Sequence, residues 1–154
     1  MTDHVLSVKR ILIVEDDADV RMTTAEALLD VGYQVDCAAD GQEALWHIEQ
    51  NRHSLPGLII CDLTMPRMDG LQFLTWMWGQ RDLPDIPTLV VTGSGRSVVT
   101  LEAGAFIVGS LSKPFAMDTL LETVARYVMP EIPDHRSAAG PNGAPALTSG
   151  IPNL

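Results

Sequence analysis

The chain has 154 residues, of which 46% are hydrophobic, so it is long and apolar enough to bury one sizeable core. Acidic residues outnumber basic ones by 20 to 10, and the resulting net charge of −10 argues against direct DNA binding, because phosphate recognition needs clustered Lys and Arg. No apolar run is long enough to span a bilayer and the N-terminus does not resemble a signal peptide, so we expect a cytoplasmic protein without membrane contact.

Short apolar runs alternate with helical patterns along the chain. The first half predicts, in order, a strand over Ile11–Val14, a helix over Ala18–Val31 ended by Gly32, a strand over Tyr33–Ala38, and a helix capped by Asp40 that continues to about Gln50. The second half predicts strands over Leu58–Cys61, Thr88–Val91 and Phe106–Leu111, and helices over Leu71–Trp78, Val98–Ala103 and Ala116–Val128.

Strands that are apolar on both faces and alternate with helices are typical of a parallel sheet covered on both sides. We therefore predict a doubly wound α/β domain over residues 9–129, preceded by a flexible N-terminus at 1–8. The segment 130–154 contains five of the ten prolines together with several glycines, and we expect it to be disordered. Cys37 and Cys61 lie in apolar runs without metal-ligand spacing, which predicts two small buried residues rather than a disulfide.

Polar side chains follow the predicted strands at their carboxyl ends, where open parallel sheets bind ligands. Glu15 and Asp16 follow the first strand, Asp62 the third, Thr92 the fourth and Lys113 the fifth. Neighbouring strands lie about 4.8 Å apart, so the three carboxylates would share a small volume.

Two bare charges about 4 Å apart repel by about 4 kcal/mol at an effective dielectric near 20, and a divalent cation would relieve that repulsion. Oxygen ligands and an open position for phosphate suit Mg²⁺. A lysine and a hydroxyl supply a cation and a donor for phosphoryl oxygens, so the implied chemistry is phosphoryl transfer onto a carboxylate.

Four segments occur in an order and spacing that resemble the receiver domain of bacterial response regulators, the phospho-accepting partners of sensor histidine kinases. These segments read ILIVEDD, LIICDLTMPRMDG, VVTGSG and SKPF, and the resemblance covers the chain from about Lys9 to Met129. It implies a flavodoxin-like (βα)₅ fold with strand order 2-1-3-4-5.

The resemblance also implies a role for each matching residue. Asp62 would be the phosphorylated nucleophile, Asp16 would bind Mg²⁺ directly, and Glu15 would act through a metal-bound water. The backbone carbonyl of Thr64 would complete the protein's share of the metal shell, and the Thr64 side chain lies where the family tunes hydrolysis of the acyl phosphate.

On the phosphate side, the resemblance implies that Lys113 pairs with the phosphoryl group and that Thr92 donates its hydroxyl to it. Gly93 would lie beside the bound phosphate. Pro114 is expected to follow a cis peptide bond, which an X-Pro bond tolerates at modest cost.

Simpler interpretations exist for some of these residues. The acids before the first helix would also be favoured there by the helix dipole, and we interpret Asp17 in that way. Thr92 before a glycine is also ordinary turn chemistry. The histidines have no ligand spacing and are expected at the surface; they are His4, His47, His53 and His135.

The tryptophans Trp76 and Trp78 allow two interpretations. The favoured one is that both are partly buried on the flanks of their helix, and the other is an exposed aromatic patch that binds a partner or a second copy. A homodimer is therefore left open.

One position departs from the family. Receivers usually carry an aromatic switch residue three positions before the lysine, where this chain has Ser110. Phe106 could replace it only in a different strand register. We hypothesise that the segment from Ser94 to Ala103 changes order on phosphorylation instead.

The leading functional hypothesis is a single-domain, non-enzymatic regulator that accepts phosphate from a sensor histidine kinase or a histidine phosphotransferase. It would then switch its binding to an unknown downstream protein. The alternatives are a phosphotransfer shuttle or phosphate sink and a receiver fragment of a hybrid histidine kinase. The starting Met1 and the lack of charged side chains in Ile151–Leu154 favour a complete gene product over such a fragment. An aspartate-nucleophile phosphatase of the haloacid dehalogenase kind ranks last, since it expects a second acid where Thr64 stands.

Overall fold

The computed structural model describes residues 7–65, 67–93 and 107–128. In that part of the chain, five parallel strands form one sheet in the order β2-β1-β3-β4-β5, which confirms the predicted flavodoxin-like arrangement. The strands are β1 (Ser7–Val14), β2 (Gln34–Ala38), β3 (Pro56–Asp62), β4 (Thr88–Thr92) and β5 (Ile107–Ser112). The helices are α1 (Ala18–Asp30), α2 (Gly41–Gln50), α3 (Gly70–Trp78) and α4 (Met117–Ala125).

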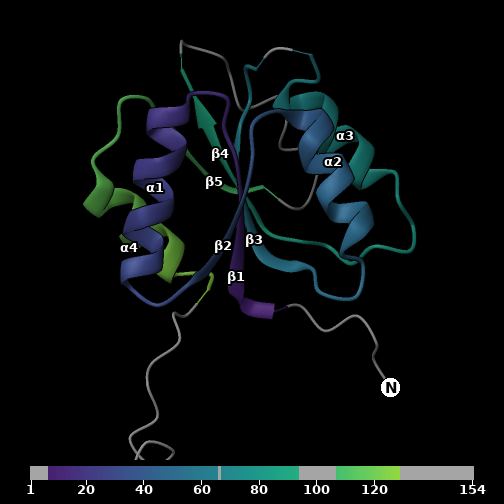
Figure 1. Ribbon diagram of the computed structural model, residues 1–154, viewed down its shortest axis with the longest axis horizontal. Helices are drawn as coiled ribbons and strands as arrows, with labels where there is room; N and C mark the ends of the chain where they lie inside the picture. Colours follow the sequence, from purple (N-terminus) through teal and green to yellow (C-terminus); the bar gives the residue numbers. More distant parts are fainter. Residues whose placement is uncertain (1–6, 66, 94–106, 129–154) are drawn as a thin grey trace, which may run out of the picture.

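The sheet is covered on both faces, with α1 and α4 on one side and α2 and α3 on the other (Figure 1). Alternate residues of each central strand supply the two cores: in β1, Ile11 and Ile13 face α1 and α4, whereas Leu12 and Val14 face α2 and α3. All residues of β3 and β4 are buried. This explains why these strands appear in the sequence as continuous apolar runs rather than as alternating patterns.

Three aspartates start the helices that lead away from the carboxyl edge of the sheet. Asp17 caps α1 and accepts bonds from the amides of Asp19 and Val20, and Asp40 caps α2. Asp69 caps α3 in a reciprocal capping box with Gln72. These caps fix the point at which the chain turns from each strand end into the next helix.

The structure extends several predicted elements and shortens others. β1 begins at Ser7, before the predicted domain start at residue 9, because polar residues continue the strand through backbone pairing that an apolar pattern cannot reveal. α4 ends at Ala125 rather than at Val128. Val31, predicted on the inner face of the first helix, is exposed because it is the C-cap of α1, and Gly32 adopts the expected positive φ of 105°.

The prediction that both cysteines are buried is correct for Cys61 and wrong for Cys37. Cys37 lies on β2, an edge strand of the sheet, and its side chain is exposed. A strand at the edge of a sheet has a neighbour on one side only, so an apolar residue type is a weaker sign of burial there.

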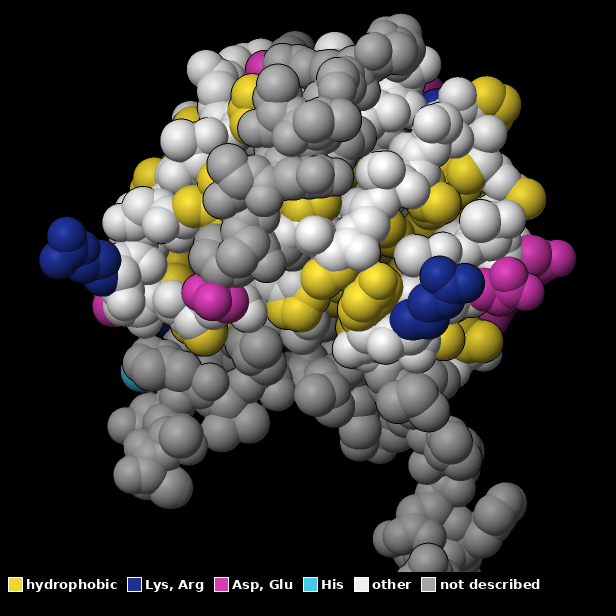
Figure 2. All heavy atoms as spheres, turned by 180° about the vertical axis from the view of Figure 1, so that it is seen from behind, with side chains coloured by type: hydrophobic (Ala, Val, Ile, Leu, Met, Phe, Trp, Pro, Cys, Tyr) yellow, Lys and Arg dark blue, Asp and Glu magenta, His cyan; other side chains and the backbone are white. Residues whose placement is uncertain are grey.

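Other predictions fall on residues that the structure does not describe: the helix Val98–Ala103, Phe106, the switch hypothesis for Ser94 to Ala103, the N-terminal residues 1–6 and the tail 130–154. No described helix is long and apolar enough to cross a membrane. On the face shown in Figure 2, Lys and Arg side chains of the described residues stand well apart rather than gathering into a basic patch.

Candidate functional site

Three carboxylates meet at the carboxyl edge of the sheet, as predicted. Glu15 and Asp16 follow β1, Asp62 ends β3, and one oxygen from each lies within 4.8 Å of the other two. The register places Val14 of β1 beside Cys61 of β3, so the residues that follow these two positions are brought together by the sheet itself. Glu15 and Asp62 are both buried, whereas Asp16 is exposed.

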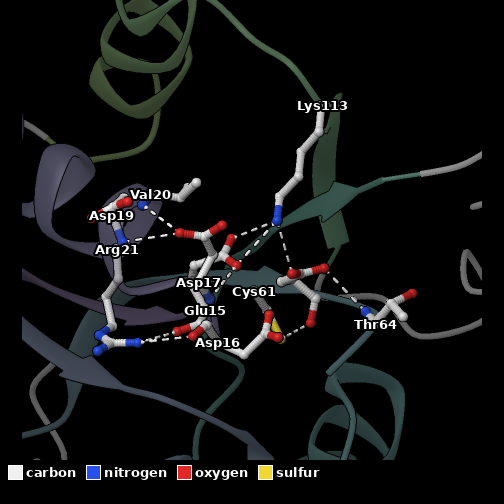
Figure 3. A network of polar contacts seen from close by, with 10 residues as sticks. Glu15, Asp16, Asp17, Asp19, Val20, Arg21, Cys61, Thr64 and Lys113 are labelled. Carbon is white, nitrogen blue, oxygen red and sulfur yellow. Dashed lines mark hydrogen bonds and ion pairs between the residues drawn. The ribbon is translucent and has the colours of Figure 1, made fainter. Parts of the chain in front are cut away.

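Lys113 reaches this cluster from the end of β5 (Figure 3). Its Nζ lies 3.0 Å from Oδ2 of Asp62, and 2.9 Å and 3.1 Å from the two carboxylate oxygens of Glu15. One ammonium therefore compensates two buried carboxylates, which would otherwise repel each other at short range. This direct contact between residues 51 positions apart joins the predicted nucleophile to the predicted phosphate-binding lysine.

Burial has opposite consequences for the two partners of this ion pair. Loss of solvation raises the pKa of Glu15 to about 7, and this effect outweighs the hydrogen bond from Lys113 that favours the carboxylate. Burial alone would lower the pKa of Lys113, but its hydrogen bonds to Glu15 and Asp62 raise it above the ordinary value. Lys113 therefore stays charged at neutral pH, whereas Glu15 titrates near neutral pH.

The loop after β3 holds the Asp62 carboxylate in place. Thr64 donates its backbone N–H to Oδ1 of Asp62 at 3.0 Å, so the two oxygens of Asp62 contact an amide on one side and the Lys113 ammonium on the other. The first residue of α3 is Gly70, and a Cβ there would lie 2.0 Å from the backbone oxygen of Asp62. Only glycine permits this close approach between the start of α3 and the end of β3.

Thr92 and Gly93 lie at the end of β4, next to Lys113. The backbone N–H of Lys113 donates to the carbonyl of Thr92 at 2.8 Å, which ties the end of β5 to the end of β4. Thr92 is buried and Gly93 is exposed. The peptide bond between Lys113 and Pro114 is cis, as expected.

A cavity of about 610 Å³ opens beside the acidic cluster, between α1 and the segment that joins β5 to α4. Its lining includes Val20, Thr24, Gly93, Lys113, Phe115 and Met117. Lys113 therefore borders both the carboxylates and this open space.

The three carboxylates fit a divalent cation by the chemistry of their donors. All are oxygen ligands from separate side chains, and the most exposed of them, Asp16, leaves access from solvent. Mg²⁺ prefers carboxylates combined with water and phosphate oxygens, and a cluster with one exposed carboxylate suits that preference. Glu15, Asp16 and Asp62 could hold such an ion, with Thr64 adjacent to them on the loop.

The remaining predictions about side chains have clear outcomes. Ser110 lies in β5 opposite Val90 of β4, and it is exposed. Trp76 and Trp78 are both partly buried and pack against the core beneath α2 and α3, and Trp76 stacks on Phe73 with 6.4 Å between ring centres. The favoured interpretation of the two tryptophans is therefore confirmed.

Two arginines near the site are absent from the sequence-based candidates. Arg21 of α1 contacts the backbone of the loop after β1, and Arg67 in the loop after β3 forms an ion pair with Asp40, the N-cap of α2. Arg67 lies inside one of the quoted motifs, and Arg21 lies four residues after the end of another. Residue type alone does not show that an arginine contacts backbone carbonyls or a buried cap.

Comparison with known proteins gives a consistent picture. The family model described as response regulator receiver domain matches residues 11–125. Response regulator MprA from Mycobacterium sp. (strain KMS) is 39% identical over 142 residues, which make up 90% of this chain and 56% of that protein. MprA from Mycobacterium tuberculosis (strain ATCC 25177 / H37Ra) is 41% identical over 115 residues and is covered over 47% of its length. The chain thus spans about half the length of these curated relatives.

Solved structures resemble the fold closely. The signal receiver domain of a putative Luxo repressor protein from Vibrio parahaemolyticus matches with a TM-score of 0.68 and 30% identity, over 77% of this chain and 88% of that one. The chemotaxis protein CheY4 of Vibrio cholerae matches with a TM-score of 0.66 and 33% identity, over 77% of this chain and 98% of that one. The five-stranded sheet in the order 2-1-3-4-5 and the acidic cluster at its carboxyl edge agree with these matches. This chain belongs to the response regulator receiver domains of bacterial two-component signalling.

Proposed function

We propose that Asp62 accepts the phosphoryl group in this receiver. The observation that carries the proposal is the contact of Lys113 Nζ with Asp62 Oδ2 at 3.0 Å, in the same cluster as Glu15 and Asp16. A carboxylate oxygen of Asp62 would attack the phosphorus of a phosphohistidine. The new O–P bond forms as the N–P bond breaks, and the imidazole leaves with the electron pair and takes up a proton.

The charges around Asp62 suit this step. Lys113 faces the carboxylate that becomes an acyl phosphate, and its ammonium can pair with phosphoryl oxygens as charge develops on them. The Thr92 hydroxyl is the proposed donor to one of these oxygens. Gly93 and the backbone amide of Thr64 are the proposed neighbours of the phosphoryl group. The exposed backbone at Gly93 leaves room for that group.

We further propose that the acidic cluster holds Mg²⁺. Glu15, Asp16 and Asp62 would provide carboxylate oxygens, and Thr64 would provide its backbone carbonyl. When bound, the ion supplies positive charge that stabilises the phosphoryl oxygens in the transition state. Asp16 is the exposed member of the set and keeps the cluster open to solvent, while the buried Glu15 and Asp62 are held by Lys113.

The proposed partner upstream is a sensor histidine kinase or a histidine phosphotransferase, and the proposed output is a switch in binding to a second protein. Such a module acts in the cytoplasm and turns over no substrate apart from its own phosphoryl group. A phosphate shuttle or sink uses the same site, and transfer of phosphate from Asp62 back to a histidine phosphotransferase would identify it. A receiver within a longer protein, including a hybrid kinase, has the same chemistry at Asp62.

The test is intact mass after incubation with acetyl phosphate, with Mg²⁺ or with EDTA. We expect wild type to gain one phosphoryl group in Mg²⁺ and none in EDTA. Asp62→Asn should gain none because an amide is not a nucleophile for this reaction. Asp85→Asn, which removes an exposed carboxylate of the same type, is the matched control and should behave as wild type. Equal labelling of Asp62→Asn and wild type would contradict the proposal.

A further inference from the structure

Arg21 is the fourth residue of α1 and extends its side chain back toward the loop that carries the acidic pair (Figure 3). Its Nη1 donates to the carbonyl oxygen of Glu15 at 2.8 Å and approaches that of Asp16 at 3.4 Å. The side chain is half-buried. A single guanidinium thus contacts two consecutive backbone carbonyls, the one before and the one after the Cα of Asp16.

Other contacts fix the two ends of this loop. The Glu15 amide donates to the carbonyl of Ala38 in β2 at 3.0 Å, and the Glu15 carboxylate accepts from the amide of Asp17 at 3.1 Å. Asp17 in turn caps α1. Asp16 lies between these fixed points with an exposed side chain, and the contact from Arg21 reaches its carbonyl.

Arg21 and Lys113 deliver positive charge to the cluster in different ways. Lys113 donates to the carboxylate oxygens of Glu15 and Asp62, so a cation bound by those oxygens competes with it. Arg21 donates to backbone carbonyls and leaves the carboxylates available as ligands. Both contacts come from the same guanidinium nitrogen, Nη1, and the nitrogen of a lysine at this position would end one bond short of it.

We propose that Arg21 is a positioning residue for the cation site: it sets the backbone of Glu15 and Asp16 so that their carboxylates face Asp62 before a cation binds. This inference rests on the proposed function and deepens it. Two effects of Arg21 oppose each other, because its charge repels a cation, whereas the alignment of the loop lowers the ordering cost of binding. The guanidinium donates to the backbone carbonyls and not to the carboxylates that would hold the ion, so we infer that alignment is the larger effect.

The test is a calorimetric titration of Mg²⁺ into wild type, Arg21→Met and Arg21→Lys, with thermal unfolding of each protein in EDTA. We expect Arg21→Met to bind Mg²⁺ about tenfold more weakly, as is typical when a group that orients metal ligands is removed. Arg21→Lys should fall between the two. Arg126→Met removes the same charge from the C-cap of α4 and should bind Mg²⁺ as wild type does.

The opposing effects make the outcomes distinct. Tighter or unchanged binding in a folded Arg21→Met would show that the guanidinium acts as a repelling charge or not at all, and would overturn the inference. An equal loss in Arg126→Met would show that the effect does not depend on contacts with the Glu15–Asp16 backbone, and would overturn the inference as well. If Arg21→Met does not fold, Arg21→Lys decides, since it keeps the charge and must still bind more weakly.

The rate of phosphorylation against Mg²⁺ concentration separates positioning from a general structural role. Arg21→Met should need more Mg²⁺ for half-maximal rate and should approach the wild-type rate at saturation. The titration contains no phosphate, so its outcome is independent of whether Asp62 is the acceptor. Failure of the proposed function would appear as unlabelled wild type that still binds Mg²⁺, whereas wild type that binds no Mg²⁺ would overturn this inference directly.

Discussion

Glu15 is a carboxylate that the fold buries beside two other acids and one lysine. The residue is 4% exposed, and burial raises the pKa of its carboxyl group from 4.5 to about 7. Between pH 4.5 and about pH 7, Glu15 keeps its proton in the folded protein but has released it in the unfolded chain. The stabilising effect of that proton is fully present below about pH 4.5, and it is lost as pH rises through about 7.

We therefore predict that, in EDTA, wild type loses stability between pH 5 and pH 8, by an amount on the order of 3 kcal/mol for a shift of this size. Glu15→Gln keeps the shape of the side chain but does not titrate, so it should lose much less over the same range. Urea unfolding at both pH values measures the difference. A parallel decline in the two proteins would show that Glu15 does not govern this pH dependence.

Cys61 directly precedes Asp62 in β3 and illustrates how strongly the same environment disfavours charge. The residue is fully buried, and burial raises the pKa of its thiol above the ordinary value. The neighbouring acids Asp62, Asp69 and Glu15 act in the same direction. The thiol is therefore protonated and unreactive, as expected of a cysteine that serves as a small core residue.

Among the elements, the loop between β3 and α3 is where packing and chemistry depend most closely on each other. The amide of Gly41, the first residue of α2, donates to the carbonyl of Met68 at 2.8 Å, and Arg67 pairs with Asp40 beside it. The loop that follows Asp62 is thus fastened to the start of α2 as well as to α3.

Gly70 provides a direct test of that close packing. We predict that Gly70→Ala destabilises the protein and slows phosphorylation, because the new Cβ would lie 2.0 Å from the Asp62 carbonyl and 2.9 Å from the Cys61 sulfur. Thermal unfolding and the mass assay measure the two effects. Gly79→Ala is the matched control at the other end of the same helix, where the nearest atom would lie at 3.5 Å, and it should be close to neutral. Similar behaviour of the two variants would contradict the steric explanation.

The order of the elements and most of the site could be predicted from the sequence because both depend on strong local signals. The apolar runs that became β1, β3 and β4, and the caps Asp17 and Asp40, are visible without tertiary information. The acids and the lysine that follow the strands are brought together by any parallel sheet of this order.

What could not be predicted depends on contacts between distant segments. The polar start of β1 pairs through its backbone, and the exposure of Cys37 follows from the position of β2 at the edge of the sheet. The side chain of Arg21 ends at two backbone carbonyls, and that of Arg67 ends at the buried N-cap Asp40. The sequence does not show where such long side chains end.

At the scale of the whole molecule, the aromatic side chains separate into core and surface. Trp76 and Trp78 pack against the core on the α2 and α3 face, whereas Trp46 of α2 is 59% exposed. Trp46 was not among the residues interpreted from the sequence, where Trp76 and Trp78 stand close together.

We predict that Trp76→Gln lowers the free energy of unfolding by about 1 to 3 kcal/mol, through loss of buried area and of the stacking on Phe73. Trp46→Gln should change it by less than about 0.5 kcal/mol, as is usual for exposed positions. Urea unfolding compares the two variants. A larger loss for Trp46→Gln than for Trp76→Gln would contradict this division between core and surface.

The most direct test of the central claim is to find which carboxylate carries the phosphoryl group. Wild type labelled with acetyl phosphate in Mg²⁺ is reduced with borohydride, which converts an aspartyl phosphate to homoserine, and is then digested and sequenced by mass spectrometry. We predict homoserine at position 62 and unmodified acids at positions 15 and 16. Homoserine at Asp16 with an intact Asp62, or no reduction product in protein that has gained the phosphoryl mass, would contradict the assignment of Asp62 as the acceptor.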